Sequence, residues 1–138
     1  MSEESTAAIV ALQVEPVIND VLGFIDRERE REIIARRYGL FDRKETLEQI
    51  GELLGITRER VRQLEKSVMT KLQTTPIDDL PHMVEVDTLF VRHLKEAGNV
   101  AKIKDLAKRL IDSDSKIDQS RIAFLARLSP SVTFLSEN

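Results

Sequence analysis

The chain has 138 residues, of which 33% are charged, and it carries a formal net charge of −3 at pH 7. It contains no cysteine, which excludes disulfide bonds and thiolate metal sites and suits a reducing, cytoplasmic environment. No run approaches the roughly 18 apolar residues of a membrane-spanning helix, so we expect no membrane association. Few glycines and prolines in a highly charged chain favour a mainly all-α fold.

The positive charge is concentrated in the middle of the sequence. Residues 1–26 hold five acidic side chains and no Lys or Arg, whereas residues 27–72 hold twelve Lys or Arg against nine Asp or Glu. Residues 73–138 hold nine Lys or Arg against ten Asp or Glu. The basic middle segment indicates a nucleic-acid partner, and its small excess of three charges predicts weak binding by the isolated chain.

Two amphipathic helices are expected near the N-terminus. After an N-terminal segment of residues 1–15, apolar side chains at helical spacing predict a helix over residues 17–25. A second helix follows, with Asp26 as its N-cap and Gly39 as its C-terminal glycine. We expect both helices to support the motif that follows, within one domain of residues 16–72.

Residues 46–72 are expected to form two helices joined by a tight turn. Thr46 is a favourable N-cap, and Gln49 three residues later completes a capping box. Gly51 lies in the first helix where a side chain would collide with the second helix, and Gly55 lies where the turn needs a positive φ. Glycines and apolar residues in this order are typical of a helix-turn-helix.

The second helix of this motif begins after Thr57, a second N-cap candidate, and its apolar stripe through Val61, Leu64 and Val68 indicates the buried face. In a major groove, Arg suits guanine, Gln suits adenine and Glu suits cytosine. The alternative interpretation is a solvated helix face held by salt bridges, and the preceding helix-turn-helix pattern favours base recognition. The opposite, exposed face carries five such polar or charged side chains: Arg58, Glu59, Arg62, Gln63 and Lys66.

The segment ITRERVRQLEKSVMTKL, preceded by RYGL and TLEQIGELLG, resembles region 4 of the bacterial sigma-70 family over about residues 17–72. The resemblance implies a module that binds the promoter −35 element of double-stranded DNA and the β-flap of RNA polymerase. It implies base contacts by Arg58, Glu59 and Gln63. The DNA backbone contacts predicted for this module come from eight residues: Arg29, Arg37, Thr46, Leu47, Thr57, Arg60, Arg62 and Lys66.

The alternating charges of residues 27–32 have two interpretations. Such a run normally marks a solvated helix surface. The resemblance instead places phosphate-binding arginines at Arg29 and Arg37, where they would position the duplex without reading its sequence. The helix that begins at Thr46 would offer backbone N–H groups to a further phosphate.

The C-terminal half is expected to form a second, smaller domain. Residues 73–83 are polar and contain two prolines, which indicates a linker. Residues 84–138 then contain three helical patterns and a short strand through Val132 and Phe134. This order resembles the start of the winged-helix module of the polymerase delta subunit type (the HARE-HTH group). We interpret it as a partial winged-helix domain in a fragment of a longer protein, with DNA binding and protein contact equally supported.

A catalytic or metal site is not expected. His82 and His93 have no further ligands at metal-binding spacing, and the sequence contains no phosphate-binding loop or nucleophile motif. We therefore expect neither an enzyme nor a cofactor.

Two functions remain open. The first is a sequence-specific DNA-binding transcription module that recognises a −35-like element in initiation or its regulation. The alternative is a docking module for RNA polymerase, through its β-flap, or for a regulator, with little DNA specificity. The intact TRERVRQ pattern favours the first function and the low positive charge favours the second.

Overall fold

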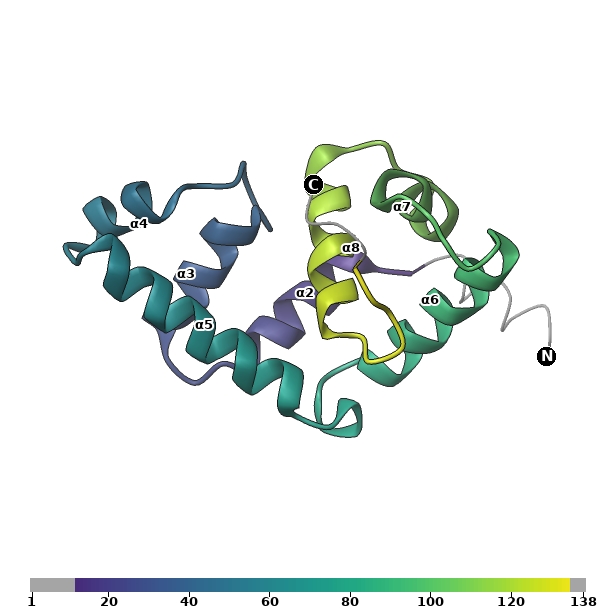
Figure 1. Ribbon diagram of the computed structural model, residues 1–138, viewed down its shortest axis with the longest axis horizontal. Coiled ribbons are helices and arrows are strands. Elements are labelled where there is room, and N and C mark those ends of the chain that lie inside the picture. Colours follow the sequence, from purple (N-terminus) through teal and green to yellow (C-terminus); the bar gives the residue numbers. More distant parts are fainter. Residues whose placement is uncertain (1–11, 135–138) are drawn as a thin grey trace.

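The computed structural model describes residues 12–134, and this part of the chain contains α-helices and one short 3₁₀ helix but no strand (Figure 1). The mainly all-α prediction is therefore confirmed. No helix among these residues has the length and apolar character needed to cross a bilayer. The helices are α2 (Val14–Gly23), α3 (Glu28–Tyr38), α4 (Leu47–Leu54), α5 (Arg58–Thr74), η1 (Ile77–Asp79), α6 (Met83–Glu96), α7 (Ile103–Ile111) and α8 (Lys116–Leu128).

Two threonines cap the N-termini of the helices in the predicted motif. The Gln49 backbone N–H donates to Thr46 Oγ1 at 3.0 Å, and the Thr46 N–H donates to Gln49 Oε1 at 2.9 Å, so the predicted capping box is confirmed. Thr57 Oγ1 accepts from the Arg60 N–H at 3.1 Å and begins α5 in the same way. Each cap satisfies a backbone donor that the first turn of a helix leaves unpaired.

The predicted N-cap of α3 is wrong. Arg27, not Asp26, occupies the N-cap position, and no side chain there accepts a hydrogen bond from the helix. The Asp26 carboxylate lies 3.9 Å from Lys71 Nζ of α5 instead. The predicted end of α3 is confirmed, because Gly39 adopts the left-handed conformation with φ 68°.

The main apolar core joins both halves of the chain. Its buried side chains come from α2, α6, α7 and α8 and also from the C-terminal half of α5, where Leu72 is 1% exposed. Leu80 and Met83 continue this core through the segment predicted as a linker. Helix α2 packs mainly against α8, in the middle of the molecule (Figure 1). The predicted domain boundary at residues 73–83 therefore stays a prediction, and the buried core is continuous across this segment.

A second, smaller cluster lies inside the helix-turn-helix. Ile33 of α3, Ile50 of α4 and Val61 of α5 are buried together. The predicted burial of Val61 is confirmed, whereas Leu64 is only half-buried at the edge of this cluster. The position of α5 on α3 and α4 is therefore set by a few side chains, and its N-terminal half projects away from the main core.

The strand predicted through Val132 and Phe134 is wrong for the described residues. The chain after α8 has no regular structure up to Phe134, and Val132 and Phe134 pack against the main core. Asp87 of α6 fixes this segment by accepting hydrogen bonds from the Ser129 hydroxyl, from the Ser131 hydroxyl at 2.8 Å and from the Ser131 N–H at 3.1 Å. Those bonds bend the backbone where a lone strand would lack a partner. Residues 135–138 lie outside the described part.

Candidate nucleic-acid interface

The turn between α4 and α5 is compact because two glycines permit it. Gly55 has φ 73°, and the Ile56 N–H donates to the Gly51 carbonyl at 3.0 Å. A Cβ atom on Gly51 would lie 2.6 Å from the Ile56 carbonyl oxygen, closer than Cβ atoms approach other heavy atoms in proteins. Both glycine predictions are confirmed, with the first contact falling on the turn immediately before α5.

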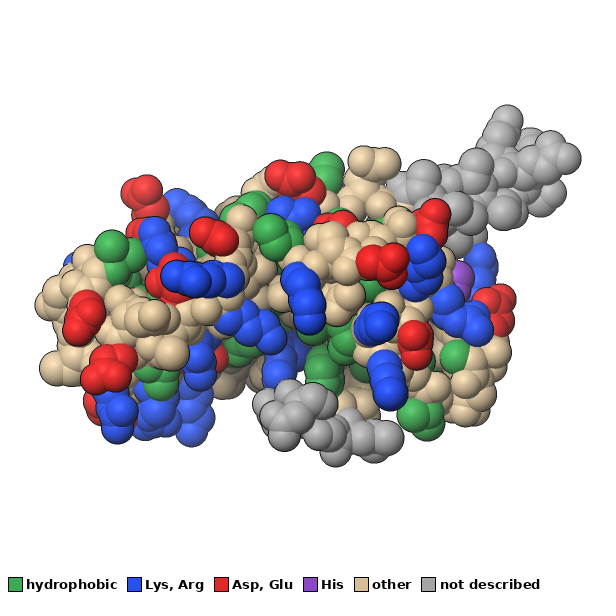
Figure 2. Space-filling view, turned by 90° about the horizontal axis from the view of Figure 1, so that it is seen from above, with side chains coloured by type: hydrophobic (Ala, Val, Ile, Leu, Met, Phe, Trp, Pro, Cys, Tyr) green, Lys and Arg blue, Asp and Glu red, His purple; other side chains and the backbone are tan. Residues whose placement is uncertain are grey.

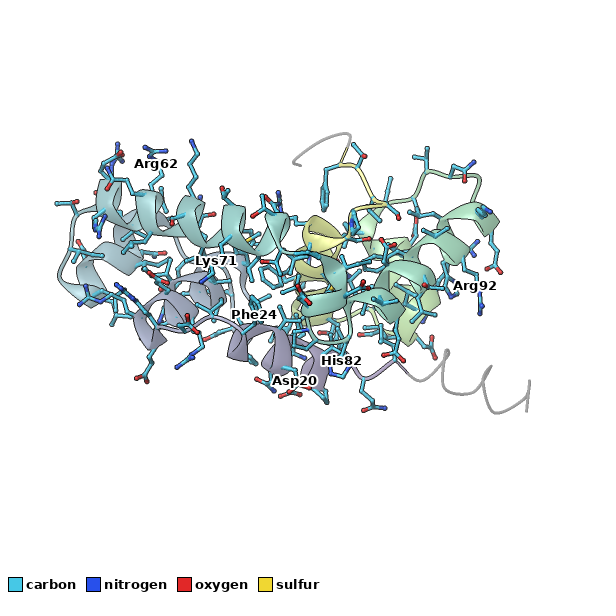
Figure 3. The ribbon with its side chains drawn as sticks, turned by 90° about the horizontal axis from the view of Figure 1, so that it is seen from below. Asp20, Phe24, Arg62, Lys71, His82 and Arg92 are labelled. Carbon is cyan, nitrogen blue, oxygen red and sulfur yellow. The ribbon has the colours of Figure 1, made fainter. Side chains whose placement is uncertain are left out.

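The polar face of α5 is exposed along its first three turns. Each of the five side chains predicted there is solvent-accessible, and Arg62 points away from the body of the molecule (Figure 3). The buried Val61 lies on the opposite side of the helix. Helical periodicity therefore assigned the two faces of α5 correctly.

Four side chains at this end of α5 form two hydrogen-bonded pairs, Arg62 with Glu59 and Arg60 with Gln63. Arg62 donates to Glu59 from Nη2 at 2.7 Å and from Nε at 3.0 Å, which holds the pKa of the Glu59 carboxyl below its ordinary value and raises that of Arg62. Arg60 Nη1 donates to Gln63 Oε1 at 3.3 Å. Exposed pairs of this kind are weak and exchange readily for contacts with a ligand. Base recognition by Glu59 or Gln63 would use side chains that this face already orients.

Other cationic side chains of α5 and α3 differ in whether they already bond to the protein. Within the described part of the chain, Arg58, Lys66 and Arg29 are exposed and make no hydrogen bond or ion pair. Arg37, by contrast, donates from Nη1 to the Glu45 carbonyl at 3.2 Å and lies 3.6 Å from Glu65. Arg37 is thus held against the protein while Arg29 is free to reach a phosphate.

The start of α4 completes the predicted set. Thr46 is exposed and Leu47 is half-buried against the small cluster. Thr57 is exposed at the start of α5, near an open groove lined by Glu48, Gly51 and Arg58 among others. The two helix starts are joined by the turn, so their backbone N–H groups belong to one surface of the motif.

A network that the sequence analysis did not identify ties this motif to α8. The Tyr38 hydroxyl donates to Glu65 Oε2 at 2.8 Å, and burial together with this carboxylate raises the pKa of Tyr38. The Arg127 guanidinium lies 5.8 Å from the centre of the Tyr38 ring, and the Arg127 carbonyl accepts from Gln73 Nε2 at 3.2 Å. The only available signal was the position of Glu65 at the edge of the buried stripe of α5.

Arg121 makes a second tie between α8 and the motif. Its Nε donates to the Leu40 carbonyl at 2.8 Å, and its guanidinium lies 5.6 Å from the centre of the Phe41 ring. The two arginines of α8 therefore serve contacts within the protein.

The two histidines lie apart from this face. His82 Nε2 is 2.7 Å from Asp20 Oδ2, which links the start of α6 to α2, and His93 Nδ1 is 3.7 Å from Glu96. Among residues 12–134, no group of three or more His, Asp or Glu side chains is arranged to hold a metal ion.

The short helix α4, a tight turn and the longer helix α5 with its exposed polar face form a helix-turn-helix, the motif that DNA-binding proteins use to place a helix in the major groove. Residues 27–74 match the family model for sigma-70, region 4. This segment is therefore a sigma-70 region 4-type helix-turn-helix. The match ends at residue 74, so the winged-helix interpretation of the C-terminal half stays a hypothesis.

The chain is also similar to curated RNA polymerase sigma factors. The chain is 52% identical over 46 residues to RNA polymerase sigma factor SigA1 of Synechococcus elongatus, and 44% identical over 64 residues to RNA polymerase sigma factor RpoD of Helicobacter pylori. These matches cover 33% and 45% of this chain but only 12% and 9% of the relatives. The chain thus spans about a tenth of the length of these relatives. No solved structure is significantly similar to it.

Proposed function

We propose that residues 16–72 bind double-stranded DNA with sequence preference for a −35-like promoter element, as a non-enzymatic module of transcription initiation or its regulation. The observation that carries the proposal is the exposed polar face of α5 within a segment that matches sigma-70 region 4. Such a face presents side chains that can hydrogen-bond to base edges in a major groove.

The proposed base contacts are Arg58, Glu59 and Gln63. Arg58 makes no hydrogen bond or ion pair within the described residues, so binding guanine would break no such contact. Glu59 and Gln63 would exchange their bonds to Arg62 and Arg60 for base edges, which releases both arginines toward phosphates. The same step supplies recognition and backbone contacts from one helix face.

The remaining backbone contacts would come from both sides of α5. Arg29 and Lys66 are exposed cations without ion pairs in the described part. Thr46, Leu47 and Thr57 mark helix starts, where backbone N–H groups favour a phosphate. Arg37 would need to share its guanidinium between Glu65 and DNA.

Docking on the β-flap of RNA polymerase is the second candidate function. Leu53 of α4 is 54% exposed and lies on the motif itself. An apolar partner surface would cover it. Leu53 is not among the residues proposed to contact DNA, so the two functions are compatible.

Arg58→Ala tests base recognition. With the full chain, fluorescence anisotropy should show tighter binding to a duplex containing TTGACA, the hexamer implied by the family resemblance, than to a scrambled duplex. The substitution should cost about 1–3 kcal/mol on the preferred duplex and reduce discrimination at a guanine. Arg29→Ala should weaken both duplexes alike, because a phosphate contact carries no sequence information.

Arg43→Ala is the matched control, since Arg43 is an exposed arginine in the loop before α4 with no role in the proposal. It should leave discrimination unchanged. Equal binding of the parent chain to both duplexes at low salt, unaltered by Arg58→Ala, would overturn base recognition and favour polymerase docking.

A further inference from the structure

The C-terminal half contains a basic block that its near-neutral total charge conceals. Residues 92–109 hold six Lys or Arg against two Asp or Glu, an excess of four. The preceding residues 73–91 hold four acidic side chains and no Lys or Arg. The block covers the C-terminal part of α6 and most of α7, and Figure 2 shows Lys and Arg side chains spread over this end of the molecule.

Four of these six cations have no counter-charge. Arg92, Lys95, Lys102 and Lys104 are exposed and make no ion pair or hydrogen bond within the described residues. The other two behave differently. Lys108 Nζ lies 3.1 Å from Asp112 and 3.7 Å from Asp114, and Arg109 lies 3.5 Å from Glu96.

Helix stability does not explain the cations of α7. Lys102 occupies the N-cap position without a side-chain capping bond, and Lys104 follows in the first turn. Cations at a helix N-terminus oppose the helix dipole, so both positions are unfavourable for the isolated helix. An anionic partner would remove this cost.

The usual DNA-contacting helix of a three-helix motif is not available here. Arg121 and Arg127 of α8 bind Leu40, Phe41 and Tyr38 within the protein. Among the described residues, α8 keeps only Lys116, at its start, as an exposed cation without a partner, whereas four such cations lie on α6 and at the start of α7.

This surface is fixed relative to the helix-turn-helix. The main core is shared by α5, α6, α7 and α8, and the ties through Arg121 and Arg127 reinforce it. Arg62 of α5 and Arg92 of α6 lie near opposite ends of the long axis of the molecule (Figure 3). The two surfaces are therefore held at a fixed separation by the shared core.

We infer that the α6–α7 surface, defined by Arg92, Lys95, Lys102 and Lys104, binds backbone phosphates of duplex DNA without reading its sequence. The choice of DNA as the partner rests on the proposed function of α5. The surface would supply part of the affinity that the small charge excess of residues 27–72 cannot provide, because counterion release scales with the number of phosphates neutralised.

The test compares two double variants of the full chain that lose the same charge from the same helix. Lys102→Ala with Lys104→Ala removes unpaired cations, and Lys108→Ala with Arg109→Ala removes paired ones. Affinity is measured by anisotropy against salt concentration, on a duplex that extends well beyond the TTGACA hexamer on both sides and on its scrambled equivalent. Lys102→Gln with Lys104→Gln repeats the first variant while keeping side-chain length, and thermal melts verify folding.

The first variant should reduce the slope of log K against log salt by about 1.8, the value for two phosphate contacts, on both duplexes alike. The paired-cation control should change the slope much less. Equal slopes for the two variants would overturn the inference, and a loss seen with duplex RNA but not with DNA would overturn the choice of partner. If Arg58→Ala leaves discrimination intact while this slope change is present, only the base-recognition proposal fails.

Discussion

Phe124→Ala should lower the free energy of unfolding by about 3–5 kcal/mol, among the largest costs expected for a single substitution in this chain. Phe124 is 1% exposed on α8, and its ring centre lies 5.4 Å from that of Tyr38 on α3. Truncation would leave a cavity where the two halves of the protein meet. Urea unfolding followed by circular dichroism measures the loss.

Phe41→Ala is the matched control because it makes the same chemical change at a site that is 42% exposed. Its ring lies 5.6 Å from the Arg121 guanidinium, a cation–π contact worth about 0.5–2 kcal/mol, so its cost should be smaller. Similar losses for the two variants would show that Phe124 is not part of a packed core.

The same experiment bears on the predicted division into two domains. Tyr38 is the only tyrosine, and it lies where α3 meets α8, so its fluorescence reports this contact while circular dichroism reports all helices. The shared core predicts that both signals change at one urea concentration. Two separate transitions would support independent domains on either side of residues 73–83.

The helix-turn-helix could be predicted from the sequence because its signals are local. Its N-caps bond to residues only three positions away: Thr46 to Gln49, and Thr57 to Arg60. The left-handed conformation of Gly55 is a property of a single residue. Periodicity alone also fixed which side of α5 is exposed. An apolar stripe does not say which helix will cover it, and for that reason the packing of α2 against α8 was not predicted.

Contacts between distant residues account for what was missed. Tyr38 and Glu65 are 27 positions apart, and Arg121 and Leu40 are 81 apart, so no spacing rule connects them. Apolar residues at Val132 and Phe134 have the two-residue spacing of a strand, which is why a strand was predicted there. The hydrogen bonds that hold this segment go to Asp87 of α6, more than 40 positions away, and local spacing does not reveal them. The basic residues 92–109 were missed because the charge was counted over all of residues 73–138, where acidic side chains offset them.

Gly51→Val should lower the free energy of unfolding by about 3 kcal/mol, the upper end of the usual cost of overpacking. The nearest atom to a Cβ at this position is the Ile56 carbonyl oxygen at 2.6 Å, and the next two are also backbone atoms, of Thr57 and Arg58. Backbone atoms cannot rotate away as a side chain would. Since the Ile56 N–H is bonded to the Gly51 carbonyl, relief of the clash must separate the turn from α4.

Gly23→Val controls for the loss of glycine from a helix, because no atom lies within 4 Å of a Cβ at Gly23. Any destabilisation there should be well below that at Gly51. The Gly51 variant should also lose its preference for TTGACA over the scrambled duplex under conditions where circular dichroism shows it folded, since α5 is held on α4 through this turn. Equal stability of the two variants would contradict the close approach of turn and helix. Retained discrimination in a folded Gly51→Val chain would show that base recognition does not depend on the angle at which α5 leaves the turn.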